Sequence, residues 1–592
     1  MRLARTAAFL LLTAVLHAET HYEIDLTRSA AGWLGIRIDT TCSIADCDFQ
    51  MPVWNATYQV RDFAQYVSGF RAQRADGAPI TTRKLGPSVW RLAASAGDRV
   101  SVAYRVRADR PGPFGAVADS RHVCLNLPQI LAYPVEERAK PFALRFAHIP
   151  PNWKTAIALP EREGVFQAES YDRLVDTPVH LSDFKETQFE LAGKRIRIVV
   201  HGPEDEYDID QLRRSAEKLT VAATDLMEDV PFPAYTFVYH FTSRGGGGME
   251  YRNGTSIHAR RKCGQCDVAE LTAHEFFHLW NVKRIRPASL EPVDFAKPVL
   301  TPSLWFSEGV TSAYSQFLRL RAGMTQPSSF LGNLAQLIYD HESRPASRLQ
   351  SAEESSLEAW LEGYPSYRRP DRSISYYAKG ELIGHLLDLT IRDRTANRRS
   401  LDDVMRLLNK EYAAKNRFFE DTVAIEQAAS RVAGADLSSV FDELVRAASP
   451  IPWDNYLGLA GFALAKTEQA VSDMGLGIVD REDGVVVSAV EPLSPAEEAG
   501  FRRGDRLLTV SGEPAKSADS VRAGLKTAAS KAVSLEIERD GEPVSLVLRS
   551  RETTETLYRI IEVEGPAPLQ LAVRRGWLER KTDGDTPNAP LR

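Results

Sequence analysis

Residues 267–280, read as D-V-A-E-L-T-A-H-E-F-F-H-L-W, constrain the fold of this chain more than any other stretch. Asp267 can cap a helix and a glutamate follows three residues later, as in a capping box, so a helix is predicted to start here. His274 and His278 then lie one turn apart on the same face. Two imidazoles at this spacing can bind one zinc ion, and Glu275 lies beside them to accept a proton from a metal-bound water.

A catalytic zinc takes three protein ligands and keeps a fourth position for water, so a third donor should follow. Glu308, in L-W-F-S-E-G-V-T-S-A-Y, is the preferred candidate because apolar residues flank it at a second expected helix start. Glu291 and Asp294 are nearer in the sequence, but prolines place them in an expected loop. The pattern predicts one Zn²⁺ per chain, held by His274, His278 and Glu308. The alternative is two surface histidines on an amphipathic helix.

Two stretches of the chain are H-E-F-F-H-L-W-N-V-K-R-I-R-P, at residues 274–287, and the later W-F-S-E-G-V-T. Together they resemble the glycyl aminopeptidase family of thermolysin-like zinc peptidases, which belongs to the gluzincins. The resemblance covers nearly the whole chain after residue 20. It implies an aminopeptidase that acts on peptides with a free N-terminus and prefers small N-terminal residues such as glycine.

Four glycines precede the metal-binding stretch in R-G-G-G-G-M-E-Y-R-N. Successive glycines leave the backbone open enough for a peptide to lie against it, although such runs are often only flexible turns. In the zinc aminopeptidases that this order of elements resembles, a glutamate after G-x-M binds the free amine of the substrate. The resemblance therefore assigns Glu250 to substrate binding, together with Gly247, Gly248 and Met249.

The stretch S-I-S-Y-Y-A-K-G resembles the Y-x-K-G of related aminopeptidases. The resemblance implies that Tyr377, rather than Tyr376, points its phenol at the scissile carbonyl. The alternative is a packing tyrosine, since tyrosine is common in protein cores.

At 592 residues the chain is too long for one hydrophobic core. Short alternating runs predict strands in the N-terminal part, and helical patterns dominate after the metal-binding stretch. We expect a multidomain α+β protein. Its expected parts are a signal peptide (1–18), a β-rich N-terminal domain (19–193), a thermolysin-like catalytic domain with a mixed sheet and a helical subdomain (194–460), a PDZ domain (466–552) and a polar tail (564–592).

The stretch D-M-G-L-G-I-V, with the following S-P-A-E-E-A-G-F-R-R-G-D, resembles a bacterial PDZ domain. Its loop would present backbone N–H groups to the C-terminal carboxylate of a peptide, and the adjoining strand could pair with that peptide. This interpretation assigns peptide binding to Gly475, Leu476, Gly477 and Ile478. Alternatively, the domain only covers or orders the catalytic cleft.

The N-terminus carries Arg2 and Arg5 before an apolar run over residues 7–16, which is too short to span a bilayer. We expect a signal peptide and export to a periplasm or to the outside, with an uncleaved anchor as the alternative and no transmembrane segment in the mature chain. The formal charge of -6 gives no reason to expect nucleic acid as a partner.

The five cysteines fit two short loops in an exported protein, Cys42 with Cys47 and Cys263 with Cys266, leaving Cys124 unpaired. A redox motif or half of a structural zinc site is the alternative for C-G-Q-C at 263–266.

Two further predictions concern charged and histidine side chains. The basic run of Lys283, Arg284 and Arg286 is interpreted as a solvated face, although one of these residues could pair with a substrate carboxylate. His258 is expected to form a local hydrogen bond in a polar loop rather than to bind a metal.

Two other functional classes remain open at this point. An endopeptidase would use the same zinc and differ only at the amine-binding end. A non-catalytic PDZ adaptor on a peptidase scaffold is the second, and the complete set of predicted ligands and base argues against it.

Overall fold

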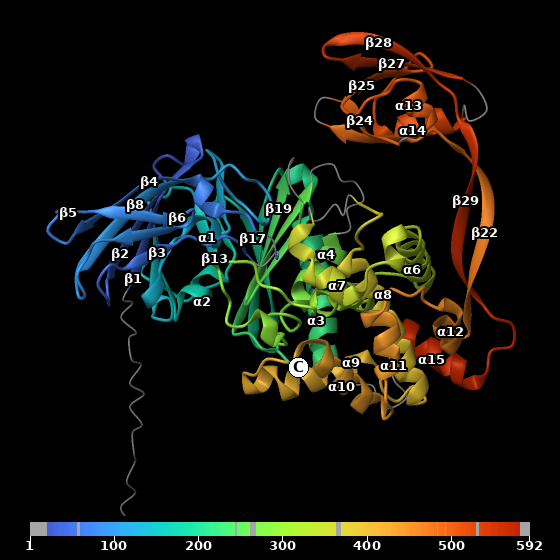
Figure 1. Ribbon diagram of the computed structural model, residues 1–592, viewed down its shortest axis with the longest axis horizontal. Coiled ribbons are helices and arrows are strands. Elements are labelled where there is room, and N and C mark those ends of the chain that lie inside the picture. Colours follow the sequence, from blue (N-terminus) through green and yellow to red (C-terminus); the bar gives the residue numbers. More distant parts are fainter. Residues whose placement is uncertain are drawn as a thin grey trace, which may run out of the picture. The chain divides into compact units, whose positions relative to one another are not determined.

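The computed structural model describes residues 20–55, 58, 60–242, 246–260, 268–362, 369–481, 484–491, 493–527 and 532–579 (Figure 1). The chain forms two compact units. One extends to Ala463 and resumes at Glu562, and the other is Leu464–Ile561. Among the described helices, none is long and apolar enough to cross a membrane. The expected signal peptide lies outside the described residues.

The N-terminal part is built of β-sheets, as expected. Strands such as β1 (Thr20–Asp25) alternate buried and outward-facing residues, which places Tyr22 and Ile24 in the core. Most neighbouring strands pair antiparallel, but β1 pairs in parallel with β12. The large sheet runs in the order β14 (Glu161–Arg162), β15 (Val165–Ala168), β12 (Phe142–Ala147), β1, β2 (Trp33–Thr41), β8 (Arg99–Arg107), β4 (Val67–Arg74) and β5 (Pro79–Ile80).

Two four-stranded sheets complete this part. One is β11 (Tyr133–Pro134), β3 (Asp48–Gln50), β7 (Val89–Leu92) and β6 (Thr82–Gly86). The other is β13 (Lys154–Ile157), β16 (Val179–Ser182), β10 (His122–Leu125) and β9 (Ala116–Ala118). The second of these sheets lies against the catalytic part, because Ala156 of β13 packs in one apolar cluster with Val199 and Val238.

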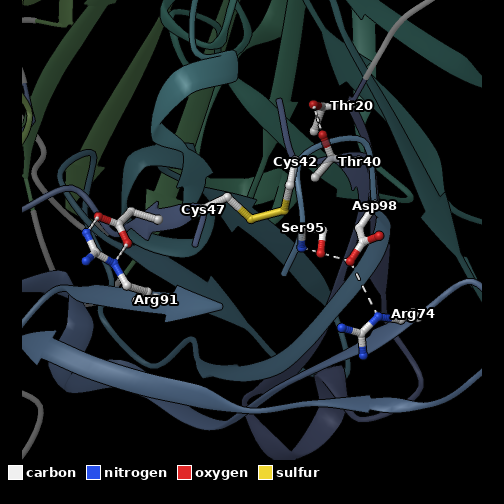
Figure 2. Close-up of a disulfide and its surroundings, with 9 residues drawn as sticks. Thr20, Thr40, Cys42, Cys47, Arg74, Arg91, Ser95 and Asp98 are labelled. Carbon is white, nitrogen blue, oxygen red and sulfur yellow. Dashed lines mark hydrogen bonds and ion pairs between the residues drawn. A yellow bond between two sulfur atoms is a disulfide. The ribbon is translucent and has the colours of Figure 1, made fainter. Parts of the chain in front are cut away.

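The cysteines follow the expected pairing where the structure describes them. Cys42 and Cys47 form a disulfide, which Figure 2 shows next to the ion pair between Arg74 and Asp98. Cys124 is free and buried. Cys263 and Cys266 lie outside the described residues.

The catalytic part begins with a five-stranded mixed sheet. Strands β18, β19 and β21 are parallel, while β17 and β20 pair antiparallel at the two edges. Strand β17 lies on the N-terminal side of the boundary expected after residue 193. The order is β17 (Lys185–Leu191), β18 (Lys194–His201), β19 (Ala234–Thr242), β21 (Gly254–Arg260) and β20 (Gly247–Tyr251).

Helices cover one face of this sheet (Figure 1). Asp208 caps α3 (Ile209–Met227) by accepting hydrogen bonds from the N–H groups of Asp210 and Gln211. The metal-motif helix α4 (Val268–Phe277) contacts α3 and the strands β20 and β21. The predicted cap Asp267 lies outside the described residues. The helix thus rests on the strand that carries Met249 and Glu250.

A helical subdomain follows. Its main helices are α5 (Thr311–Arg321), α6 (Pro327–Glu342), α7 (Ala352–Leu357), α8 (Tyr376–Arg394), α9 (Leu401–Glu411), α10 (Asp421–Ala433), α11 (Ser438–Phe441) and α12 (Trp453–Leu457). Residues 568–579, which belong to the expected polar tail, instead form helix α15 (Pro568–Glu579). Its Trp577 is fully buried against Phe330 and His385. The segment is polar overall, but the helix is stabilised here because the large apolar ring of Trp577 is removed from water. Residues 580–592 lie outside the described part.

The second unit has the elements of a PDZ domain around one apolar core that includes Ile478, Val485 and Leu535. Its strands are β23 (Leu476–Arg481), β24 (Gly484–Val490), β25 (Arg506–Val510), β26 (Glu513–Pro514), β27 (Val533–Arg539) and β28 (Glu542–Leu548), with helices α13 (Pro495–Glu498) and α14 (Ala518–Thr527). Strands β22 (Phe462–Asp473) and β29 (Arg551–Glu562) form a separate two-stranded ribbon.

Candidate functional site

The structure brings His274, His278 and Glu308 together. His274 lies in α4, and His278 follows its last residue while its N–H still bonds to the His274 carbonyl. The two Nε2 atoms are 3.0 Å apart. The Glu308 Oε2 atom lies 3.5 Å from His274 Nε2 and 3.2 Å from His278 Nε2. Three donor atoms from two distant segments therefore surround one point.

The spacing of these donors fits a metal ion. With bonds of about 2.0–2.2 Å in tetrahedral geometry, ligand atoms lie about 3.3 Å from one another. The measured separations of 3.0, 3.5 and 3.2 Å bracket that value. Glu291 and Asp294, the alternative third ligands, instead pair with Arg286 and Lys297. Of the three carboxylates considered, only Glu308 is placed to hold a metal with the two histidines.

Hydrogen bonds orient the donors. His278 Nδ1–H donates to the Asn281 carbonyl over 2.7 Å, which directs Nε2 toward His274 and Glu308. The Asn281 amide in turn donates to the Phe306 carbonyl over 2.8 Å, close to Glu308 in the chain. The two segments that carry the donors are therefore joined directly.

Glu308 lies in a π-helical turn, η6 (Trp305–Val310), that runs into α5. This turn packs tightly against α8. A Cβ atom placed on Gly309 would lie 2.4 Å from the Gly380 Cα atom, and one placed on Gly380 would lie 2.1 Å from the Trp305 carbonyl oxygen. Neither position can hold a larger residue without moving the backbone. The two glycines therefore allow the close approach that fixes Glu308.

The electrostatics favour a bound cation. Burial alone would raise the pKa of Glu308, but His278 and His274 outweigh it and lower the pKa below its ordinary value. Burial likewise opposes charging of His278, yet Glu308 raises the pKa of this histidine to about 10. The buried Glu308 carboxylate thus stays ionised and favours a proton on His278, so a positive charge between these two residues stabilises the site.

Glu275 lies beside the three donors and is buried. Burial raises the pKa of its carboxyl well above the ordinary range, although His278 acts in the opposite direction. Its Oε2 atom has no hydrogen-bond partner among the described residues. The other oxygen, Oε1, would lie 2.2 Å from a Cβ placed on Gly248. Glycine at this position therefore makes the room that Glu275 occupies.

Glu250 is buried and lies near the same point. One of its oxygens is within 4.8 Å of ligand atoms of Glu275 and His278. Its Oε1 atom has no hydrogen-bond partner among the described residues, and Lys283 Nζ is 3.8 Å from it. Burial raises the pKa of Glu250, and Lys283 lowers it. Met249, next to Glu250, is also buried.

The basic run is not a solvated face, and that interpretation was wrong. The Lys283 side chain is 12% exposed and its Nζ atom lies 3.0 Å from Asp176. Arg284 donates to the Leu279 carbonyl over 2.7 Å, and Arg286 pairs with Glu291. The sequence did not predict that Lys283 is buried near the site, because its partner Asp176 comes from a distant part of the chain.

Of the two adjacent tyrosines, Tyr377 lines the cleft that contains the metal donors, and its ring lies 6.1 Å from that of His274. Tyr376 is buried in a different apolar cluster, with Trp54 and Tyr58. The cleft has a volume of about 310 Å³ and is also lined by Phe114, Gly247 and Gly248. A second cavity of about 270 Å³ shares Glu250 with it.

In the second unit, Gly475 precedes the edge strand β23 and has a positive φ of 61°. A Cβ at Gly475 would lie 2.1 Å from the Ser494 Cβ atom. Leu476 and Gly477 begin the strand, while the Ile478 side chain is in the core of this unit. Ile478 can therefore contribute its backbone, but not its side chain, to a bound peptide.

Comparisons with known proteins match three parts of the chain. The profile of the M61 glycyl aminopeptidase matches residues 267–383, that of the peptidase M61 N-terminal domain matches 21–183, and that of the PDZ domain matches 472–549. The crystal structure of an aminopeptidase N family protein from Idiomarina loihiensis covers 94% of this chain and 100% of its own, with a TM-score of 0.79 at 24% identity. The fold is thus that of a thermolysin-like peptidase.

Two curated relatives match over short stretches. A protein of Clostridium perfringens named as a zinc metalloprotease is 30% identical over 100 residues, which is 16% of this chain and 30% of that protein. A DegP-like periplasmic serine endoprotease of Rhizobium meliloti is 38% identical over 56 residues, which is 9% of this chain and 11% of that protein. The chain spans less than a third of the length of either relative.

Proposed function

The chain belongs to the M61 glycyl aminopeptidase family, and from that premise we propose that it is a zinc aminopeptidase that hydrolyses N-terminal residues, small ones such as glycine, from peptides. The observation that carries this proposal is the group formed by His274, His278 and Glu308, whose donor atoms lie 3.0–3.5 Å apart beside two further buried carboxylates.

His274, His278 and Glu308 would hold one zinc ion, which supplies Lewis-acid chemistry and lowers the pKa of water when bound. Glu275 accepts the proton of the attacking water and then passes it to the leaving amine. Its unpartnered Oε2 atom supports this role. Gly248 also supports this role. Because it has no side chain, the Glu275 carboxylate has room to lie against strand β20, which the substrate contacts.

Tyr377 donates a hydrogen bond to the oxygen of the scissile carbonyl as negative charge develops there. Its place in the cleft beside His274 supports this assignment over Tyr376, which is buried and is not among the described residues that line the cleft. The backbone of Gly247 and Gly248 lies along the same cleft and is available to a peptide.

Glu250 binds the free amine of the substrate. An ammonium group loses hydration on entering the cleft, and a buried carboxylate offsets that loss through a charge-assisted hydrogen bond. The unpartnered Glu250 Oε1 atom supports this role, since Lys283 at 3.8 Å is too distant to hydrogen-bond to it. Met249 places the carboxylate by anchoring β20 in the interior.

Export is part of the proposal. The apolar run after Arg2 and Arg5 supports a leader peptide. The disulfide between Cys42 and Cys47 supports an oxidising compartment such as a periplasm. We also propose that the PDZ domain binds the C-terminus of a peptide at its edge strand β23, through the backbone of Gly475, Leu476, Gly477 and Ile478.

Metal analysis of the purified chain, together with a screen of N-terminal amino-acid amides, tests the proposal. We expect one zinc per chain and cleavage that depends on it. Glu275→Gln should keep zinc, because Glu275 is not a ligand, and should lose turnover because the general base is gone. A variant that lost zinc but kept its activity per bound zinc would show that Glu275 has another role.

A further inference from the structure

A second cluster of metal-binding side chains lies on the other face of the catalytic sheet. It consists of Cys124, His240 and His258, whose ligand atoms all lie within 4.8 Å of one another. Tyr239 bonds to Thr272 of α4, so its neighbour His240 points to the opposite face of β19. The sheet therefore separates this cluster from the peptidase site.

Three strands from two parts of the chain supply the cluster. His240 on β19 and His258 on β21 are direct partners in the parallel pairing, and their rings stack with centroids 4.2 Å apart. Cys124 comes from β10 of the N-terminal domain, 116 residues from His240 in the sequence. The expectation that His258 lies in a polar loop was wrong, although its local hydrogen bond to Ser256 is present.

The distances fit a three-coordinate metal centre. Cys124 Sγ lies 3.4 Å from His240 Nε2 and 3.9 Å from His258 Nε2. Metal bonds of about 2.3 Å to sulfur and 2.0 Å to nitrogen, arranged in a trigonal plane, separate such donors by about 3.5–3.8 Å. The two sulfur–nitrogen separations are close to these values, whereas the stacked imidazole rings must rotate before both Nε2 atoms point at one ion.

Hydrogen bonding alone accounts poorly for this cluster. His240 and His258 are both buried, and the Nδ1 atom of each has no hydrogen-bond partner among the described residues. An unpartnered buried polar atom destabilises a fold. Ligation through the two Nε2 atoms would replace their present hydrogen bonds, to Cys124 Sγ from His240 and to Ser256 Oγ from His258, and would leave the Nδ1 atoms as they are.

The charge of the site selects the ion. All three groups are buried, so any net charge on the metal centre would lie away from water. One thiolate and two neutral imidazoles carry a charge of -1. A monovalent cation makes the centre neutral, whereas a divalent ion would leave a buried positive charge, which is costly. Thiolate ligands also favour Cu(I) among the first-row metals.

We propose that Cys124, His240 and His258 form a second metal site that binds a soft monovalent cation of the Cu(I) class and links the N-terminal domain to the catalytic sheet. The thiol loses its proton as the sulfur–metal bond forms, and no change of oxidation state is involved. Local opening of the edge strand β9, which pairs with β10, would admit the ion. The site does not depend on the proposed peptidase activity.

The test uses the full-length zinc-loaded chain with Cys263→Ser and Cys266→Ser, so that Cys124 is the one remaining thiol. Cu(I) is added anaerobically without a thiol reductant, against a competing chelator, and copper and zinc are counted after gel filtration. We expect one tightly bound copper per chain with zinc unchanged, and a higher Tm. Silver(I), which is redox-inert, should bind in the same ratio.

Cys124→Ser and His258→Gln should each weaken Cu(I) binding by at least about a hundredfold. His201→Gln is the matched control, because the ring of this histidine lies 6.2 Å from that of His240 without being one of the three ligands, and this variant should bind copper as the parent does. Equal binding by Cys124→Ser, or a preference of the site for Zn²⁺, would overturn the proposal. If the ligand variants do not fold, copper-edge absorption of the parent decides, since a copper without one sulfur neighbour refutes the site.

Discussion

In the proposed function, Glu250 is the residue on which aminopeptidase activity, rather than endopeptidase activity, depends. The residue is 7% exposed, and its Oε1 atom has no hydrogen-bond partner among the described residues. An ammonium group bound there would gain a charge-assisted hydrogen bond of about 1.5–3 kcal/mol. Glu250→Ala should therefore lower kcat/KM for peptides with a free N-terminus by about 10- to 150-fold.

An N-acetylated peptide of the same sequence has no charge for Glu250 to bind, so its cleavage should hardly change. The assay measures kcat/KM for this matched pair, because the lost binding energy can appear in either constant. Glu250→Gln keeps the size of the side chain and should lie between wild type and Glu250→Ala. Asp294→Asn, which removes a charge outside the cleft, is the control.

Two results would refute the assignment. If wild-type protein cleaved the blocked peptide as fast as the free one, Glu250 would have no amine to bind and the endopeptidase alternative would hold. If Glu250→Ala slowed both peptides equally while zinc was retained, Glu250 would act on the reaction itself rather than on the N-terminus.

Three further predictions test the other parts of the site. Glu308→Ala should lose zinc and activity together, measured as metal per chain, whereas unchanged zinc would mean that Glu308 is not a ligand. Tyr377→Phe should lower kcat by about a hundredfold with KM little altered, and an equal loss in Tyr376→Phe would contradict the assignment. Burial lowers the pKa of Lys379 to about 8 in the folded chain. Between that pH and the unfolded pKa of about 10.4, the unfolded chain binds a proton that the folded chain has lost. The free energy of unfolding therefore rises with pH over this range. Lys379→Met should remove about 2 kcal/mol of that rise between pH 7.5 and 10, as measured by denaturant unfolding at the two pH values, and an unchanged rise would contradict it.

Several of the predictions rest on short-range geometry. His274 and His278 share a face because a helix turns every 3.6 residues, so their spacing alone indicated a common metal. A capping box of Ser400 and Asp403 begins α9, and such a box needs only neighbouring residues. Glu308 was reached by counting ligands and weighing local composition.

What local patterns could not predict depends on partners that are distant in the sequence. Lys283 is buried because Asp176 lies beside it, and Gly309 and Gly380 matter because two helical segments touch there. Trp577 is buried because it meets a surface made by α6 and α8.

By itself, the sequence determined the metal-binding motif, the β-rich, peptidase and PDZ parts of the chain, and the family. Only the tertiary structure decided that Glu250 has an unpartnered oxygen near Glu275, and that Cys124 meets His240 and His258. The physical reason is that the hydrogen bonds of a helix, and the face on which each side chain of a helix or strand lies, are set by residues a few positions apart. Burial and convergence of side chains are set by packing between elements, which no local pattern encodes.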